Sequence, residues 1–120
     1  MRTAAKALTA ALILAALALP GWAAFVPGTE DVPLAPGLEI PAEQSVVFDQ
    51  PSGRIVEATA SGPAEPAAVE RFYAESLPQL GWKAAGKGRW TRAEETLSLT
   101  IARQGRTTTV RFTLTPQDRP

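Results

Sequence analysis

The fold depends on the stretch Val69-Glu70-Arg71-Phe72-Tyr73-Ala74-Glu75-Ser76-Leu77-Pro78-Gln79-Leu80-Gly81-Trp82. Apolar side chains recur in it at positions i, i+3, i+4, i+8 and i+11, namely Val69, Phe72, Tyr73, Leu77 and Leu80. This spacing places them on one side of a helix and predicts a single amphipathic helix that packs on a sheet. Pro66 suits its first turn, and Gly81 suits the left-handed position after its end. Pro78 removes a backbone hydrogen bond inside the span, so we expect the helix to kink or tighten there.

Short strands are predicted on both sides of this helix. Residues 45–49 and 54–60 form a hairpin joined by the turn 50–53, and strands at 82–84, 89–92, 96–102 and 107–115 follow the helix, with turns at 86–88, 93–95 and 104–105. Leu97, Leu99 and Ile101 alternate with polar residues, as expected when only one side of an antiparallel sheet is covered. The sequence therefore predicts an α+β fold, with one helix on one face of an antiparallel sheet of about five to six strands in the order β-β-α-β-β-β-β.

The first 23 residues have the pattern of a secretory signal peptide. Arg2 and Lys6 precede an apolar run over residues 7–19, and Gly21 and Ala23 are small residues at the −3 and −1 positions of a cut after Ala23. The apolar run is too short to span a bilayer comfortably, although an uncleaved N-terminal anchor is the alternative. We expect export to the periplasm or the medium, and no membrane span after cleavage.

Residues 24–44 are predicted to form a Pro-rich extended strap. Four prolines exclude a helix and disfavour a central strand: Pro27, Pro33, Pro36 and Pro41. The strap also carries enough apolar residues for part of the span 31–40 to lie against the domain, with a disordered tail as the alternative. A single α+β domain is then expected over residues 45–115, followed by a short tail over 116–120.

Composition excludes several classes of function. The chain has 120 residues with 45% hydrophobic and 20% charged side chains, and it has no Cys and no His. It therefore lacks disulfides, thiolate nucleophiles, thiolate zinc ligands and the commonest general base. A small core without these supports has modest stability, which dimerisation or packing of the strap would raise. We expect no cofactor and no metal.

Short motifs carry a resemblance to known proteins. Before the first predicted strands the chain contains Asp31-Val32-Pro33-Leu34-Ala35-Pro36-Gly37, and it continues with Val69, Phe72-Tyr73 and Leu80-Gly81-Trp82. In this it resembles small exported bacterial proteins and lipoproteins of unknown function with a D-V-P-x-x-P-G-like opening and a V-x-x-F-Y…L-G-W helix. The resemblance implies an α+β domain in an envelope or secreted setting and brings no catalytic residue. Many of these proteins carry a lipobox Cys, which this chain lacks.

Charge is distributed unevenly along the chain. Residues 24–80 contain two basic and nine acidic side chains, whereas residues 81–120 contain eight basic and three acidic ones. If Trp82 and Trp90 point inward, strand alternation places one basic and hydroxylated set on the outward face: Lys83, Arg89, Thr91, Arg111 and Thr113. Lys83, Arg89 and Arg111 are therefore the candidate partner-binding residues, for an anionic partner. The alternative is a solvated face, or one that the acidic strap and helix neutralise.

The remaining candidates for function are weaker. Phe72, Tyr73 and Trp82 could line a pocket for a small apolar ligand, but packing of the helix explains their spacing. Trp90 could stack on a sugar or a base, although export argues against nucleic acid and a buried Trp is the alternative. Adjacent Glu94 and Glu95 sit in an expected turn and do not form a facing acid pair.

We expect that the chain is not an enzyme. We expect instead an exported interaction module of the cell envelope that binds a protein or anionic component through the open sheet face or the strap, with an apolar-ligand carrier as the alternative.

Overall fold

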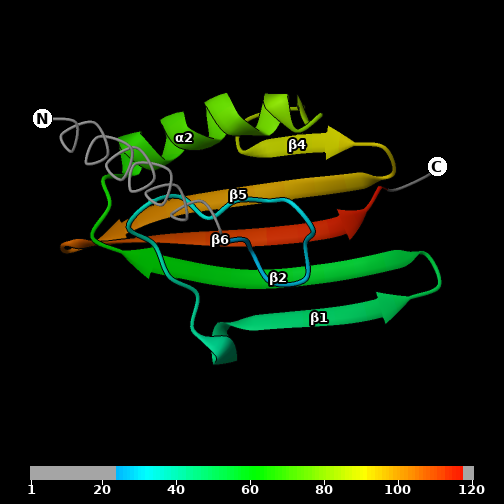
Figure 1. Cartoon of the computed structure of the whole chain (residues 1–120), viewed down its shortest axis with the longest axis horizontal. Coiled ribbons are helices and arrows are strands. Elements are labelled where there is room, and N and C mark those ends of the chain that lie inside the picture. Colours follow the sequence, from blue (N-terminus) through cyan, green and yellow to red (C-terminus); the bar gives the residue numbers. More distant parts are fainter. Residues whose placement is uncertain (1–23, 118–120) are drawn as a thin grey trace, which may run out of the picture.

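The structure is a computed structural model that describes residues 24–117, so the predicted signal peptide at 1–23 and the last three residues lie outside it. The α+β prediction is confirmed: in this described range, one α-helix accompanies a six-stranded antiparallel sheet. In chain order the elements are η2 (Ala42–Gln44), β1 (Ser45–Gln50), β2 (Gly53–Gly62), α2 (Pro66–Gln79), β3 (Lys83–Ala84), β4 (Arg89–Arg92), β5 (Glu95–Gln104) and β6 (Thr107–Pro116). Figure 1 shows the helix lying beside β4 and β5.

The strand order across the sheet is β1-β2-β6-β5-β4-β3. Most neighbours along the chain pair as hairpins, and β6 enters between β2 and β5. Antiparallel partners face the same side of a sheet, so the register fixes the composition of each face. Val56 lies opposite Leu114 and Ala60 opposite Val110, and both pairs belong to the buried face.

The end of α2 has the geometry that Pro78 and Gly81 predict. The Leu80 N–H donates to the Leu77 carbonyl at 3.0 Å, a tighter i to i−3 bond in the turn that contains Pro78. The Trp82 N–H returns to the Leu77 carbonyl at 3.1 Å, and the Gly81 N–H donates to the Pro78 carbonyl at 3.1 Å. Gly81 has φ +93°, so the helix ends in a Schellman motif that turns the chain into β3.

Two turns differ from the sequence prediction by one residue. Arg92 lies opposite Glu95, so the loop between β4 and β5 contains only Ala93 and Glu94, and Glu95 begins β5. Likewise Gln104 lies opposite Thr107, and the last hairpin loop is residues 105–106 instead of 104–105. Gly105 adopts φ +63° at the first loop position, where a glycine is favoured in two-residue hairpins.

The strap forms part of the hydrophobic core. Four of its side chains are buried together with those of the sheet and helix: Val26, Val32, Ala35 and Leu38. Its end pairs with β2 through reciprocal backbone hydrogen bonds between Glu39 and Ser61, at 3.0 and 2.9 Å. Figure 1 shows this segment, in cyan, looping across the sheet. The expectation that part of the span 31–40 lies against the domain is therefore confirmed, and the packing extends back to Val26.

No helix within residues 24–117 is long and apolar enough to cross a membrane.

Candidate functional site

The predicted basic residues share the outward face of the sheet. Trp82 is buried and Trp90 is partly buried against the core, so both point inward, as the prediction of the outward face assumed. Trp90 lies opposite Leu97 on the core face, so its neighbour Arg89 and the residue opposite it, Ser98, point the other way. By the same register, Lys83 lies opposite Thr91, and Arg111 lies between Thr59 and Thr100.

The three cations follow a diagonal across the sheet. Lys83 is on edge strand β3, Arg89 is on β4 two residue positions further along, and Arg111 is on β6 two positions beyond that. From standard strand spacings, consecutive Cα atoms along this diagonal are about 8 Å and about 12 Å apart. Hydroxyl side chains fill the positions between them: Thr91, Thr96, Ser98, Thr100 and Thr113.

Few carboxylates accompany these cations. Among the strand residues of the outward face, the register gives three basic side chains and one acidic one, Glu57, which lies opposite Thr113 and diagonal to Arg111. Lys83, Arg89 and Arg111 are all exposed, and none of them forms an ion pair within residues 24–117. The face therefore presents a small excess of positive charge that is free to meet an external anion.

The strap and α2, which carry most of the acidic side chains of residues 24–80, pack on the opposite side of the sheet. The buried residues of the strap and of α2 join the core with Val56, Phe112 and Leu97, which all face that side. Sheets carry their two faces on opposite sides of a hydrogen-bonded layer, so the strap and helix do not cover Lys83, Arg89 or Arg111. The strap and helix therefore do not contact the basic face directly, and a solvated face remains the alternative to a binding surface.

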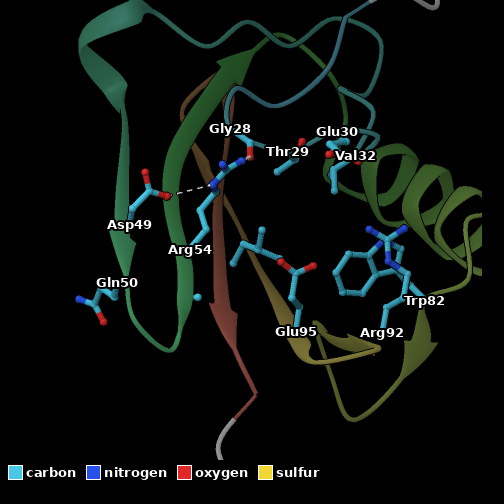
Figure 2. Close-up of a pocket in the computed structure, with 12 residues that line it drawn as sticks. Gly28, Thr29, Glu30, Val32, Asp49, Gln50, Arg54, Trp82, Arg92 and Glu95 are labelled. Atoms are coloured by element: carbon cyan, nitrogen blue, oxygen red, sulfur yellow. Dashed lines mark hydrogen bonds and ion pairs between the residues drawn. The ribbon is translucent and has the colours of Figure 1, made fainter.

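A cavity of about 490 Å³ lies on the core side, where the first loop of the strap faces the ends of the strands. Figure 2 shows charged side chains of both signs around it. It is lined by Gly28, Thr29, Glu30, Val32, Asp49, Gln50, Gly53, Arg54, Trp82, Arg92, Glu95 and Leu114. Arg54 bonds the Asp49 carboxylate at 3.4 Å and the Gly28 carbonyl at 3.2 Å, and Arg92 also has a carboxylate partner. Both arginines of the cavity are therefore already paired, unlike those of the outward face.

Arg92 joins three segments of the chain at the edge of this cavity. Its guanidinium donates to both carboxylate oxygens of Asp31, at 2.9 and 3.2 Å, and to the Leu80 carbonyl at 2.9 Å. The guanidinium carbon also lies 4.3 Å from the ring centroid of Trp82, close enough for a cation–π contact. A bidentate pair of this kind fixes both direction and distance. Arg92 thus ties the strap to the C-terminus of α2 and to β4.

Tyr73 makes the second link between strap and helix. Its hydroxyl donates to the Pro33 carbonyl at 2.7 Å and accepts from the Ala35 N–H at 3.1 Å. Burial raises the pKa of this hydroxyl well above its ordinary value, and the bond from Ala35 offsets only part of the increase. The hydroxyl therefore remains a protonated donor. The side chain is only 2% exposed and its ring meets those of Phe72 and Phe112 edge to face, in accord with the predicted core role.

The links that Arg92 and Tyr73 make to the strap were not predicted, although some of the residues involved belong to motifs that the sequence analysis singled out. Asp31, Leu80 and Trp82 all belong to the short motifs on which the family resemblance depends, and the structure brings them together around Arg92. The partners of the Tyr73 hydroxyl are backbone groups of the strap. The motif residues therefore have a structural explanation, namely closure of the strap over the core.

A second groove, of about 460 Å³, runs between α2 and the strands β4 and β5. Its walls include the rings of Tyr73 and Trp90 and the side chains of Leu99 and Ile101, and Glu70 and Lys87 also line it. Trp90 is partly buried here against the core, in accord with the alternative that it is a buried Trp. This groove is where an apolar ligand between helix and sheet would lie.

No metal-binding cluster is found among residues 24–117. No group of three or more acidic side chains within this range could hold a metal ion. Glu94 lies in the loop and Glu95 begins β5, facing the cavity from one wall. The expectation that the chain is not an enzyme stays a prediction.

Comparison with known proteins gives no significant match to a protein-family model, a curated protein or a solved structure. The resemblance to small exported bacterial proteins therefore also stays a prediction.

Proposed function

We propose that this chain is an exported, non-enzymatic interaction module of the cell envelope, which binds an acidic protein or another anionic envelope component on the outward face of its sheet. The observation that carries the proposal is the placement of Lys83, Arg89 and Arg111 on one exposed face without carboxylate partners among the described residues. The helix and strap fill the other face.

The strap is a weaker candidate for the binding surface than the sheet. Val26, Val32, Ala35 and Leu38 are buried in the core, so the apolar side chains that an extended binding arm would offer are already in use. The outward face has no such internal partner. Its diagonal of cations, separated by hydroxyl side chains, suits a partner with several anionic groups spaced along its surface, because each cation can then meet a different anion.

Charge reversal on this face should abolish or strongly weaken partner binding. We expect the triple variant Lys83→Glu, Arg89→Glu, Arg111→Glu to reduce recovery of partners from an envelope extract by about tenfold or more, since each exposed ion pair contributes up to about 1 kcal/mol. Binding by the unmodified protein should also weaken as salt is raised, because exposed charges are screened. The measurement is a pull-down with the immobilised protein, quantified by mass spectrometry at low and high salt.

A matched control separates the face from net charge. Arg71, Lys87 and Arg106 are exposed, and they lie on the helix and in two turns and not on the outward face. Replacing these three by Glu gives the same change in net charge and should leave the recovered partners unchanged. If the first triple variant still recovers the same partners, or if the control loses them equally, the outward face is not the binding surface.

A second candidate, a carrier of a small apolar ligand, is favoured by the groove along α2. Trp90, Leu99 and Ile101 offer apolar contact there, and its volume of about 460 Å³ is within the range of small-molecule sites. Native mass spectrometry of protein purified from its own host should then show a bound small molecule, and Ile101→Trp should fill the groove and displace it. A chain that is consistently empty would exclude this function.

A further inference from the structure

β1 is an exposed and strongly apolar edge strand. The described residues include four large hydrophobic side chains that are clearly exposed, and three of them are consecutive in this strand: Val46 at 45%, Val47 at 43% and Phe48 at 50%. β1 pairs with β2 on one side only. In Figure 1 only η2 approaches it from the other side, at the start of the strand. Alternate N–H and C=O groups of such a strand point away from the sheet and are open to another strand.

The two edge strands of the sheet differ in length and in the features that protect an edge against pairing. The opposite edge, β3, is only two residues long and begins with Lys83, features that discourage pairing with another chain. β1 has six residues and contains neither Pro nor Lys, and its register with β2 runs without a bulge from Ser45 to Gln50. An apolar edge of this length, with Asp49 as its one charged residue, is expected to pair with another strand.

The sequence of β1 is complementary to itself in the antiparallel direction. Around Val47 it reads polar, apolar, apolar, apolar, polar, from Ser45 to Asp49. Two copies related by a two-fold axis perpendicular to the sheet keep their faces aligned, so paired residues must lie on the same face. With Val47 opposite its own copy, Val46 meets Phe48 twice, and each Asp49 meets a Ser45 hydroxyl. No carboxylate then faces another carboxylate, and all the exposed apolar side chains of β1 are paired.

We propose that β1 is the site at which two copies of this chain pair edge to edge, antiparallel and in the register that sets Val47 opposite Val47, to form a continuous twelve-stranded sheet. Pairs of an aromatic with a β-branched residue are among the cross-strand contacts that stabilise sheets. A second copy is favoured over an unrelated extended peptide because the polar and apolar pattern of β1 matches its own reverse. The interface is one strand wide, below the standard size of protein interfaces, so the dimer is expected to be weak and concentration-dependent.

The association is tested by sedimentation velocity of the purified protein between about 5 and 500 µM, a range suited to small interfaces. We expect the sedimentation coefficient to rise from the monomer to the dimer value. Phe48→Lys should weaken the dimer at least tenfold, because it places a charge opposite Val46 on each side of the axis. Ala102→Lys is the matched control, since Ala102 is an exposed residue on the same face but on β5, and it should leave the association unchanged. A monomer over the whole range, or dimers that persist in Phe48→Lys, would overturn the proposal.

The register is tested by cysteine cross-linking, which is clean because the chain has no Cys. Opposite residues of antiparallel strands have Cβ atoms about 4.5–5.5 Å apart, close to the distance that a disulfide needs. Under mild oxidation Val47→Cys should give a covalent dimer, whereas Ala102→Cys should remain monomeric. No cross-link at position 47, or a stronger one with Phe48→Cys, would contradict this register. A monomer that co-purifies with a strand-forming peptide of another protein would show that β1 pairs with a different partner.

Discussion

Gly62→Ala is expected to lower the free energy of unfolding by about 2–3 kcal/mol, the upper part of the range for overpacked sites. A Cβ atom at this position would lie 1.8 Å from the Gly37 carbonyl oxygen and 3.2 Å from the Leu38 Cα. These are backbone atoms of the strap, so they can give way only if the strap moves off β2. Elsewhere in a strand the same change would be expected to stabilise by about 0.5–1 kcal/mol, so the two cases differ in sign. Chemical denaturation of both proteins measures the difference.

Ser61→Ala is the neighbouring control for this prediction. Ser61 already carries a Cβ and keeps its backbone pairing with Glu39 after the change, so its effect should stay within about 0.5 kcal/mol. If Gly62→Ala is neutral or stabilising, the strap does not pack against the end of β2 in solution.

Tyr73→Phe is expected to cost about 1–3 kcal/mol, because it leaves a buried donor and a buried acceptor without partners. The groups affected are the Ala35 N–H and the Pro33 carbonyl, both in the strap, while the ring and its contacts are retained. The denaturation midpoint should fall, and hydrogen exchange at the Ala35 amide should become much faster.

Thr29→Ala provides the contrast for Tyr73→Phe. The Thr29 hydroxyl bonds the Val26 carbonyl at 2.6 Å, entirely within the strap, so its loss removes a local contact and no link to the helix. Protection of the Ala35 amide should survive this change. Equal protection of that amide in Tyr73→Phe would mean that the Tyr73 hydroxyl does not hold the strap.

The regular elements could be predicted from the sequence because their signals are periodic and local. Helical spacing from Val69 to Leu80 and alternation along β5 and β6 depend on neighbours within a few residues, and both patterns are confirmed by the structure. The hairpin loops shifted by one residue, since Glu95 and Gln104 fit a strand end as well as a turn. Strand pairing decides such positions, and pairing is not local.

The outward face could also be predicted, but only in part. Alternation alone places Lys83, Arg89 and Arg111 on one side once Trp82 and Trp90 face inward. Their diagonal arrangement needs the strand order, in which β6 lies between β2 and β5, and no pattern within a single strand reveals that order.

The path of the strap and the cavity beneath it could not be predicted. Prolines and glycines give the strap no regular period, so its residues indicate only that it is extended. Its fixed points are long-range contacts, such as the pair between Asp31 and Arg92, which are 61 residues apart. A single opposite-charge pair is one of many that the sequence allows, and nothing in the sequence selects it.

The links to the strap also bear on when the chain can fold. Tyr73 lies 38 residues after Ala35, and Arg92 lies 61 residues after Asp31, so these two links to the strap cannot form until Tyr73 and Arg92 are present. Contacts between distant residues slow folding, because a long loop must close before the contact forms. In a protein that leaves the cell N-terminus first, as we propose, the strap would cross the membrane well before the residues that hold it. Because the contacts that complete the core form late, the chain would stay unfolded, and therefore able to be transported, until its second half has followed.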